Sequence, residues 1–268
     1  MKLFDLIQNC RVFDLAQPYF VGMPHFPTHP PFLFSLTKKH GDMISEGGVS
    51  SAADAITFGG HVGTHIDALC HFSYGGMLHG GVDASANQSY GGGMRHLTVD
   101  TIAPILRRGV LLDVAGHLGQ EALAKDFAIT PEHLEATALA QRVSIEAGDV
   151  VLLRTGWARY FDDPAKYITG GRGSQPLGPG PEIEGARWLS ARRVFAAGSD
   201  TVAFERVPAG SMPVHVHLLV ESGIHIIEVL DLEALAKARV YEFLFMAAPL
   251  KIRGGTGSPI RPLAICSQ

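Results

Sequence analysis

The sequence has little of what would tie it to nucleic acid, to a membrane or to an oxidising compartment. Charged residues make up 18% of its 268 residues and the formal net charge is −4, so it carries no basic surplus to neutralise phosphates. Its three cysteines lie far apart, which excludes a disulfide framework and a CxxC metal clamp. No apolar run reaches the length of about 18 residues that a membrane helix requires. We expect a protein that binds neither nucleic acid nor a membrane.

The first residues also lack the pattern of a targeting segment. Residues 1–12 include Asp5 and Arg11 and contain no continuous apolar stretch. We therefore expect no signal peptide and a cytoplasmic location, which agrees with the low number of cysteines.

The apolar content, 46%, is sufficient for a large core. Segments rich in Val, Leu, Ile or Phe predict strands that are covered on both faces, at residues 11–15, 55–58, 110–114, 150–154, 194–197 and 241–247. Capping residues and first-turn prolines predict helices at residues 131–141, 181–191, 213–223 and 231–237. Strands and helices continue on both sides of every Gly- or Pro-rich loop, so we predict one α/β domain over residues 1–268.

Histidine is abundant, with 13 copies, and three of them share one segment. Residues 59–72 read GGHVGTHIDALCHF, and three glycines within five residues disfavour a helix there. In an extended chain, residues separated by an even number of positions lie on one side. A roughly extended or gently curved segment would therefore direct His61, His65, Asp67 and His71 toward one point.

These side chains suit a divalent metal ion. Two imidazoles and a carboxylate are typical ligands of Zn²⁺ or Mn²⁺, with coordination positions left for water. Gly63 has the same parity and no side chain, which would leave space between the ligands. The alternative is a set of hydrogen-bonded polar residues without a metal, but burying so many polar groups without a shared purpose is costly.

The segment HVGTHIDALCHF closely resembles the HxGTHxDxxxH signature of the cyclase family, whose members include bacterial kynurenine formamidases and isatin hydrolases. Further stretches resemble family landmarks in family order, namely residues 23–27 (MPHFP), 148–157 (GDVVLLRTGW), 198–201 (GSDT) and 254–262 (GGTGSPIRP). The resemblance covers nearly the whole chain. It implies an α/β domain with a mostly β core of the swivelling β/β/α type.

The resemblance also implies a second half of the metal site. Family members place a histidine, and a glutamate some twelve or thirteen residues later, near the first ligands. His215 and Glu228 fit this spacing, and His217 is the alternative to His215. Asp67 would then bridge two ions, so the cofactor is one or two ions of Zn²⁺ or Mn²⁺ per chain.

For the remaining site residues the resemblance gives His71 the role of the catalytic acid–base. Phe26, Phe58 and Phe72 are candidates for the walls of a pocket for a flat aromatic substrate, because they flank the signature or lie in the proline-rich N-terminal loop. Cys70 has the opposite parity to the ligands, so we expect a buried thiol rather than a nucleophile.

The function implied is metal-dependent cleavage of a C–N amide bond. Our first hypothesis is a kynurenine formamidase-like enzyme that hydrolyses a small aryl formamide resembling N-formylkynurenine. The alternatives are a lactam-opening isatin hydrolase and, further off, a non-catalytic metal-binding protein or a polyketide-type cyclase. Family members commonly form dimers or larger assemblies, so we expect a homodimer or larger homo-oligomer that binds a small aromatic amide or lactam.

Overall fold

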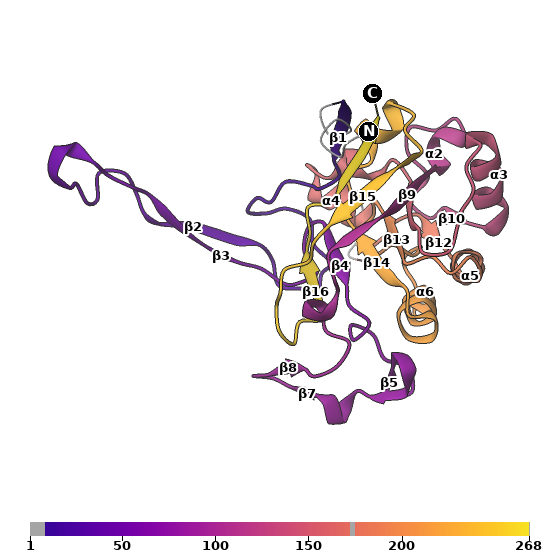
Figure 1. The fold of residues 1–268 in the computed structure, drawn as a ribbon, viewed down its shortest axis with the longest axis horizontal. Coiled ribbons are helices and arrows are strands. Elements are labelled where there is room, and N and C mark those ends of the chain that lie inside the picture. Colours follow the sequence, from indigo (N-terminus) through magenta and orange to yellow (C-terminus); the bar gives the residue numbers. More distant parts are fainter. Residues whose placement is uncertain (1–8, 172–174, 268) are drawn as a thin grey trace.

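The computed structural model describes residues 9–171 and 175–267, and its centre is a nine-stranded mixed sheet (Figure 1). The strand order is β1 (Cys10–Asp14), β17 (Leu263–Ser267), β15 (Glu242–Ala247), β9 (Ile105–Asp113), β11 (Val150–Arg154), β13 (Ala196–Ser199), β14 (His225–Glu228), β4 (His65–Asp67) and β16 (Gly257–Pro259). Strands β9, β11, β13 and β14 are parallel, and the strands on either side of this group pair antiparallel.

The other described elements are short. The helices are α2 (Val114–His117), α3 (Pro131–Gln141), α4 (Pro164–Thr169), α5 (Ile183–Ala191), α6 (Pro213–His215), which continues as a π-helix (Val216–Ser222), and α7 (Glu233–Lys237). Single 3₁₀ turns lie at Glu46–Gly48, His79–Gly81, Ser85–Asn87, Val99–Thr101 and Trp157–Tyr160. Two-stranded pairs are formed by β2 (Leu33–Lys38) with β3 (Ala53–Thr57), β5 (Met77–Leu78) with β6 (Val82–Asp83), β7 (Gln88–Ser89) with β8 (Gly93–Met94), and β10 (Ala128–Ile129) with β12 (Gly180–Pro181).

Both faces of the parallel strands are covered, as their continuous apolar sequences predict. In β9 the side chains of Val110 and Leu112 belong to the core beneath α3, α5 and the π-helix, whereas Leu111 belongs to the core on the other face. That second core includes Phe245 of β15 and Leu235 of α7. The sheet is therefore held between a helical layer and its own curled antiparallel strands.

The α/β class with a mostly β core is confirmed, and several elements agree with their predicted bounds. Strand β11 spans the predicted residues 150–154, and α3 begins after Thr130, whose hydroxyl accepts the backbone N–H of His133. The helix predicted from residue 213 ends at Gly223, which has a φ of 67°. Its second part is π-helical, which the sequence did not indicate.

The prediction of a buried strand at residues 55–58 is wrong. Residues 53–57 pair only with β2, and together they form a long hairpin that projects from the body (Figure 1). We call residues 33–57 the arm. None of its residues is buried, and Lys38 and Ser50 alone are partly covered. The apolar residues of β3 suggested a core strand, whereas none of the described residues outside the arm covers them.

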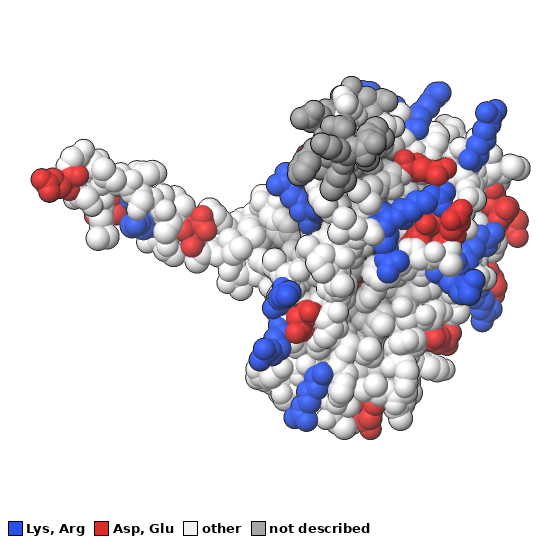
Figure 2. All heavy atoms as spheres, viewed as in Figure 1, with Lys and Arg blue, Asp and Glu red and all other residues white. Residues whose placement is uncertain are grey.

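None of the helices within residues 9–171 and 175–267 has both the length and the hydropathy needed to cross a bilayer. Most of the segment on which we based the expected absence of a signal peptide lies outside the described residues, which begin at residue 9. Figure 2 shows Lys, Arg, Asp and Glu interspersed over the visible face of the body, and only scattered charges along the arm.

Candidate metal centre and active site

Two of the predicted ligands lie on the short strand β4, deep in the sheet. His65 and Asp67 are both 1% exposed, and as alternate residues of a strand they share one face. Strand β14 pairs antiparallel with β4 and places Glu228 directly opposite His65. Long-range pairing of these strands therefore brings Glu228 to His65 and Asp67, which are far from it in the sequence.

His61 and His71 approach this strand from its two ends. The single extended segment that we expected is wrong, because only residues 65–67 are a strand; residues 59–64 form a loop, and His71 N–H donates to Ala68 O in a turn. The need for a glycine at position 63 also has a different cause from the one we expected. Its φ is 67°, and a Cβ atom there would lie 2.5 Å from the ring of Tyr19, so Tyr19 rather than a ligand fills the space.

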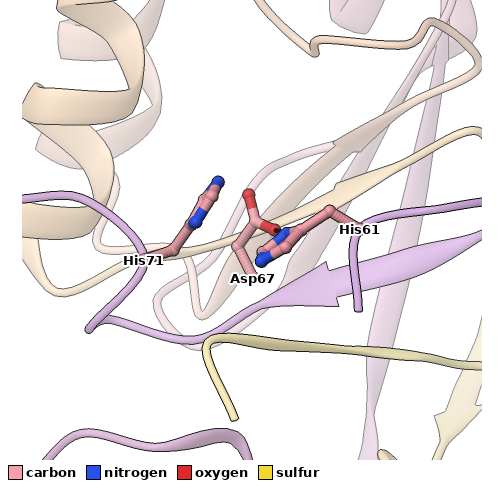
Figure 3. Close-up of side chains that lie close together, drawn as sticks. All are labelled: His61, Asp67 and His71. Carbon is pink, nitrogen blue, oxygen red and sulfur yellow. Dashed lines mark hydrogen bonds and ion pairs between the residues drawn. The ribbon is translucent and has the colours of Figure 1, made fainter. Parts of the chain in front are cut away.

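Asp67 lies at the centre of the first group of ligands. Figure 3 shows its carboxylate between His61 and His71. Asp67 Oδ1 is 2.7 Å from His61 Nδ1 and 3.5 Å from His65 Nε2. The rings of His61 and His71 stack with their centroids 3.8 Å apart. Donor atoms of His61, Asp67 and His71 all lie within 4.8 Å of one another, which is close enough to share an ion.

A second group shares Asp67 with the first. Donor atoms of Asp67, His215 and Glu228 also lie within 4.8 Å of one another, and all three residues are buried. His217, the alternative to His215, faces elsewhere: its ring contacts Ser190 Oγ at 2.8 Å and Glu221 Oε2 at 2.7 Å. The structure thus places His215 in the cluster, and Asp67 where it could bridge two ions.

Glu205, which the sequence analysis did not identify, fixes the orientation of His215. Its Oε1 is 2.6 Å from His215 Nδ1 and accepts the backbone N–H of His215 at 3.0 Å. Glu205 is 1% exposed. With Nδ1 held in this way, Nε2 is the ring nitrogen that faces Glu228, at 3.2 Å from its Oε1.

The donor set fits a divalent cation. His65 Nδ1 lies 2.8 Å from Gly63 O, which makes it the protonated nitrogen and leaves the Nε2 lone pair free. His65 Nε2, Asp67 Oδ2 and Glu228 Oε1 are buried without a hydrogen-bond partner. Buried polar atoms are almost always paired, so three orphaned atoms that converge on one place indicate a missing partner. Imidazole and carboxylate donors together suit Zn²⁺ or Mn²⁺.

Burial and the neighbouring charges set the protonation of the cluster in the absence of an ion. Burial lowers the pKa of His71 well below its ordinary value, which leaves the ring neutral and able to accept a proton. Burial alone would raise the pKa of Asp67, but His71, His61 and His65 lower it. For His215, burial would lower the pKa, yet the neighbouring carboxylates of Glu205 and Glu228 raise it to about 10.

A cavity of about 200 Å³ opens beside these residues, below the range of about 300–1,000 Å³ that is typical of sites for drug-sized ligands. The cavity is lined by residues of the cluster, of the N-terminal loop and of the loop before α6. These residues are Phe26, Thr28, His29, His71, Phe72, Val202, Ala203, Met212, His215 and Glu228. Two of the three predicted aromatic residues, Phe26 and Phe72, are therefore at the cavity. Phe58 instead packs against Tyr19 and Phe32, with ring centroids 6.0 and 6.2 Å away.

His29 and Thr256 are further residues that sequence reasoning missed. The ring centroid of His29 lies 5.3 Å from that of His61, and Thr256 Oγ1 is 2.9 Å from His61 Nε2. Each lies in or beside a stretch that resembles a family landmark, which was the only available signal. Glu205 had no such signal, because it follows the GSDT stretch in an irregular segment.

Cys70, Asp200 and Arg154 lie near the signature or at strand ends, and the contacts of each of them stabilise the fold. Cys70 is 4% exposed and packs in the hydrophobic core, as expected for a structural thiol. Asp200 accepts hydrogen bonds from the backbone N–H groups of residues 155–157 and from the Thr155 hydroxyl, so it stabilises a turn. Arg154 pairs with Asp113 and Glu233 at 2.8 Å.

The family model described as "Putative cyclase" matches residues 13–206, which is most of the chain, and the protein belongs to the cyclase family. The match includes the His61–His71 signature and Glu205.

Individual relatives agree with this membership. The chain is 29% identical over 215 residues to an isatin hydrolase from Roseibium aggregatum, covering 78% of this chain and 73% of that protein. It superposes on a crystal structure described as a novel cyclase with a TM-score of 0.87 and 32% identity, over 97% of this chain and 88% of the other. Isatin hydrolase A from Ralstonia solanacearum gives a TM-score of 0.75 and 26% identity, over 97% and 94% of the two chains.

Proposed function

We propose that this protein is a metal-dependent hydrolase that cleaves the C–N amide bond of a small aromatic amide or lactam. The observation that supports this most strongly is the convergence of three orphaned, buried donor atoms, on His65, Asp67 and Glu228, beside a cavity. Membership of the cyclase family and the similarity to isatin hydrolases support the same reaction class.

The ligands of the proposed centre are His61, His65, Asp67, His215 and Glu228, for one or two ions of Zn²⁺ or Mn²⁺. A divalent ion held there would lower the pKa of a bound water and polarise the substrate carbonyl. Asp67 belongs to both groups of donor atoms and therefore fixes the distance between the two groups. Glu205 holds His215 in one tautomer through its Nδ1 contact.

His71 is the proposed acid–base. Its ring lines the cavity and is neutral because burial lowers its pKa, so it can accept a proton from the attacking water. As the C–N bond breaks, the same ring would return that proton to the nitrogen, which leaves as an amine from an open amide and stays on the ring-opened product of a lactam. Stacking on His61 fixes the plane of the ring for both transfers.

The substrate is proposed to be small, flat and aromatic. The cavity is limited to about 200 Å³, and Phe26 and Phe72 supply apolar walls next to the polar cluster. An isatin-like lactam is supported by the name of the curated relative. An open aryl formamide such as N-formylkynurenine, our first hypothesis from the sequence, is the equal alternative, because Asp67 and Glu228 favour a binuclear centre of the formamidase type.

Turnover of these two substrates tests the proposal. Purified protein would be given isatin, whose colour disappears on ring opening, and in parallel N-formylkynurenine. The proposal expects hydrolysis of at least one of them, with loss of activity on addition of a chelator. Hydrolysis that a chelator leaves unchanged, or failure on both substrates and on a wider panel of aromatic amides and lactams, would contradict it.

A further inference from the structure

Among the described residues that line the cavity, His29 is the one imidazole that the proposed chemistry does not use. Its ring lies beside those of His61 and His71, with centroids 5.3 and 6.2 Å away. The two groups of donor atoms that are close enough to share an ion do not include a nitrogen of His29. His29 therefore borders the space in which the substrate is proposed to react, and neither metal binding nor the proposed proton transfer accounts for it.

The N-terminal loop holds His29 at the cavity through a turn. Residues 26–29 (FPTH) form this turn, which is closed by a hydrogen bond of 2.9 Å from the last N–H to the first carbonyl. Pro27 occupies the second position of the turn, where its fixed φ is favourable. The next residue, Pro30, packs on Gly59, because a Cβ atom at Gly59 would lie only 3.0 Å from Pro30 Cδ. The backbone on both sides of the His29 ring is therefore anchored.

A contact to the backbone determines the tautomer of the His29 ring. His29 Nδ1 lies 3.4 Å from His61 O, and since a carbonyl oxygen only accepts, Nδ1 carries the proton. A neutral ring that is protonated at Nδ1 has a lone pair on Nε2. Nε2 makes no hydrogen bond within residues 9–171 and 175–267. Because the ring lines the cavity, this lone pair is available to a bound molecule.

We propose that His29 Nε2 accepts a hydrogen bond from the N–H of the amide that is cleaved, so that the protein selects secondary amides and lactams over their N-alkylated forms. This inference rests on the proposed function and narrows its substrate class. Isatin and N-formylkynurenine both carry a hydrogen on the nitrogen of the C–N bond that would break. An acceptor at this point recognises the feature that the two candidate substrates share.

The separation of His29 and His71 suits a nitrogen that contacts both rings. A hydrogen-bonded atom lies about 4 Å from the centroid of an imidazole, so centroids 6.2 Å apart allow one nitrogen to contact both at an angle of about 100°. This angle is close to that between two substituents of a tetrahedral atom. His71 would then return its proton to the nitrogen while His29 accepts from the original N–H. By drawing electron density onto the nitrogen, His29 would also ease its protonation.

The test compares amides that carry the N–H with amides in which a methyl group replaces its hydrogen. Isatin and formanilide, and any other aromatic amide that the protein hydrolyses, would each be paired with the N-methyl derivative. The assays would run near pH 8, where an ordinary imidazole is neutral. His29→Phe keeps a flat ring and lacks the acceptor. It should lower kcat/KM by about 10- to 100-fold on the N–H substrates, because their N–H is left without a partner.

On the N-methyl substrates His29→Phe should change kcat/KM by less than about threefold, because these have no N–H to lose a partner. Each substrate is compared between two proteins, so the size of the methyl group does not enter the comparison. Where an N-methyl compound is not turned over, its inhibition constant against the N–H substrate replaces kcat/KM.

Two further variants separate recognition from a structural effect. His29→Gln retains an acceptor and should recover most of the loss on the N–H substrates. His25→Phe makes the same exchange in the same loop at a half-buried histidine that does not line the cavity, and should behave as wild type on every substrate. Metal content would be measured in each sample, because the His29 ring contacts the backbone of the proposed ligand His61.

The outcomes distinguish this inference from the proposed function. Equal losses on the N–H and N-methyl substrates in His29→Phe, no loss on either, or the same loss in His25→Phe would each overturn the inference and leave the proposed function standing. A wild type that hydrolyses no aromatic amide or lactam would overturn the proposed function and this inference with it.

Discussion

Glu205 Oε1 lies 2.6 Å from His215 Nδ1, and this contact determines which ring nitrogen of His215 faces the proposed metal centre. A carboxylate on the far nitrogen also makes the near nitrogen a stronger ligand. Glu205→Gln should therefore weaken metal binding by about 10- to 100-fold, measured by titration of metal-free protein with Zn²⁺ or Mn²⁺. The control is Glu221→Gln, which alters the similar contact of 2.7 Å to His217 and should leave the affinity unchanged. Equal affinities for wild type and Glu205→Gln would show that the contact has no part in metal binding.

His71→Ala should lower kcat by about 10²- to 10⁴-fold while sparing the metal content, because His71 is proposed to move protons. Metal would be quantified in the same samples that are assayed. His217→Ala removes a histidine whose ring points away from the cavity and should keep wild-type turnover. If His71→Ala lost metal together with activity, His71 would be a ligand, which its position within 4.8 Å of the donor atoms of His61 and Asp67 also permits.

Phe72→Ala should raise KM by about tenfold, because Phe72 lines the cavity and its ring lies 4.8 Å from that of His215. Phe58→Ala is the comparison, since Phe58 packs on Tyr19 and Phe32. It should reduce thermal stability without a matching rise in KM. The reverse pattern would place the substrate on the Phe58 side and would support the prediction that Phe58 contacts it.

Asp200 should make the stability of the protein depend on pH. Burial raises its pKa to about 6, although hydrogen bonds from Thr155 partly oppose this. The folded state thus retains a proton that the unfolded state releases near pH 4, and stability falls as the pH rises from about 4 to about 6. Relative to Asp200→Asn, the wild type should lose up to about 3 kcal/mol of unfolding free energy over this range. Denaturant unfolding of both proteins at pH 4 and pH 7 measures the difference, and a constant difference would contradict the assignment.

The sequence predicted the parts of the site that lie within one short stretch. His61, His65, Asp67 and His71 were identified by their spacing and by their resemblance to the family signature, and the structure brings them together. The spacing argument worked for a different reason than expected: a loop and a turn, rather than one extended strand, direct the outer histidines inward.

The residues alone did not indicate contacts between distant segments, and only the family resemblance placed His215 and Glu228 near the first ligands. The pairing of β14 with β4, which puts Glu228 opposite His65, depends on tertiary structure that no local pattern encodes. Glu205 could not be found because it reaches His215 from an irregular segment. The arm was misread because the apolar residues of β3 indicate a surface to be covered, and the sequence does not reveal whether the protein's own core or another molecule covers it.

The central claim is tested most directly by metal binding itself. Metal-free wild-type protein and Asp67→Asn would each be dialysed against Zn²⁺ and, separately, Mn²⁺, and the bound ions per chain would be counted. We expect one or two ions in the wild type and a clear loss in Asp67→Asn, because Asp67 belongs to both groups of donors. Wild-type protein that binds no stoichiometric ion, while it remains folded, would contradict the assignment of this cluster as a metal centre.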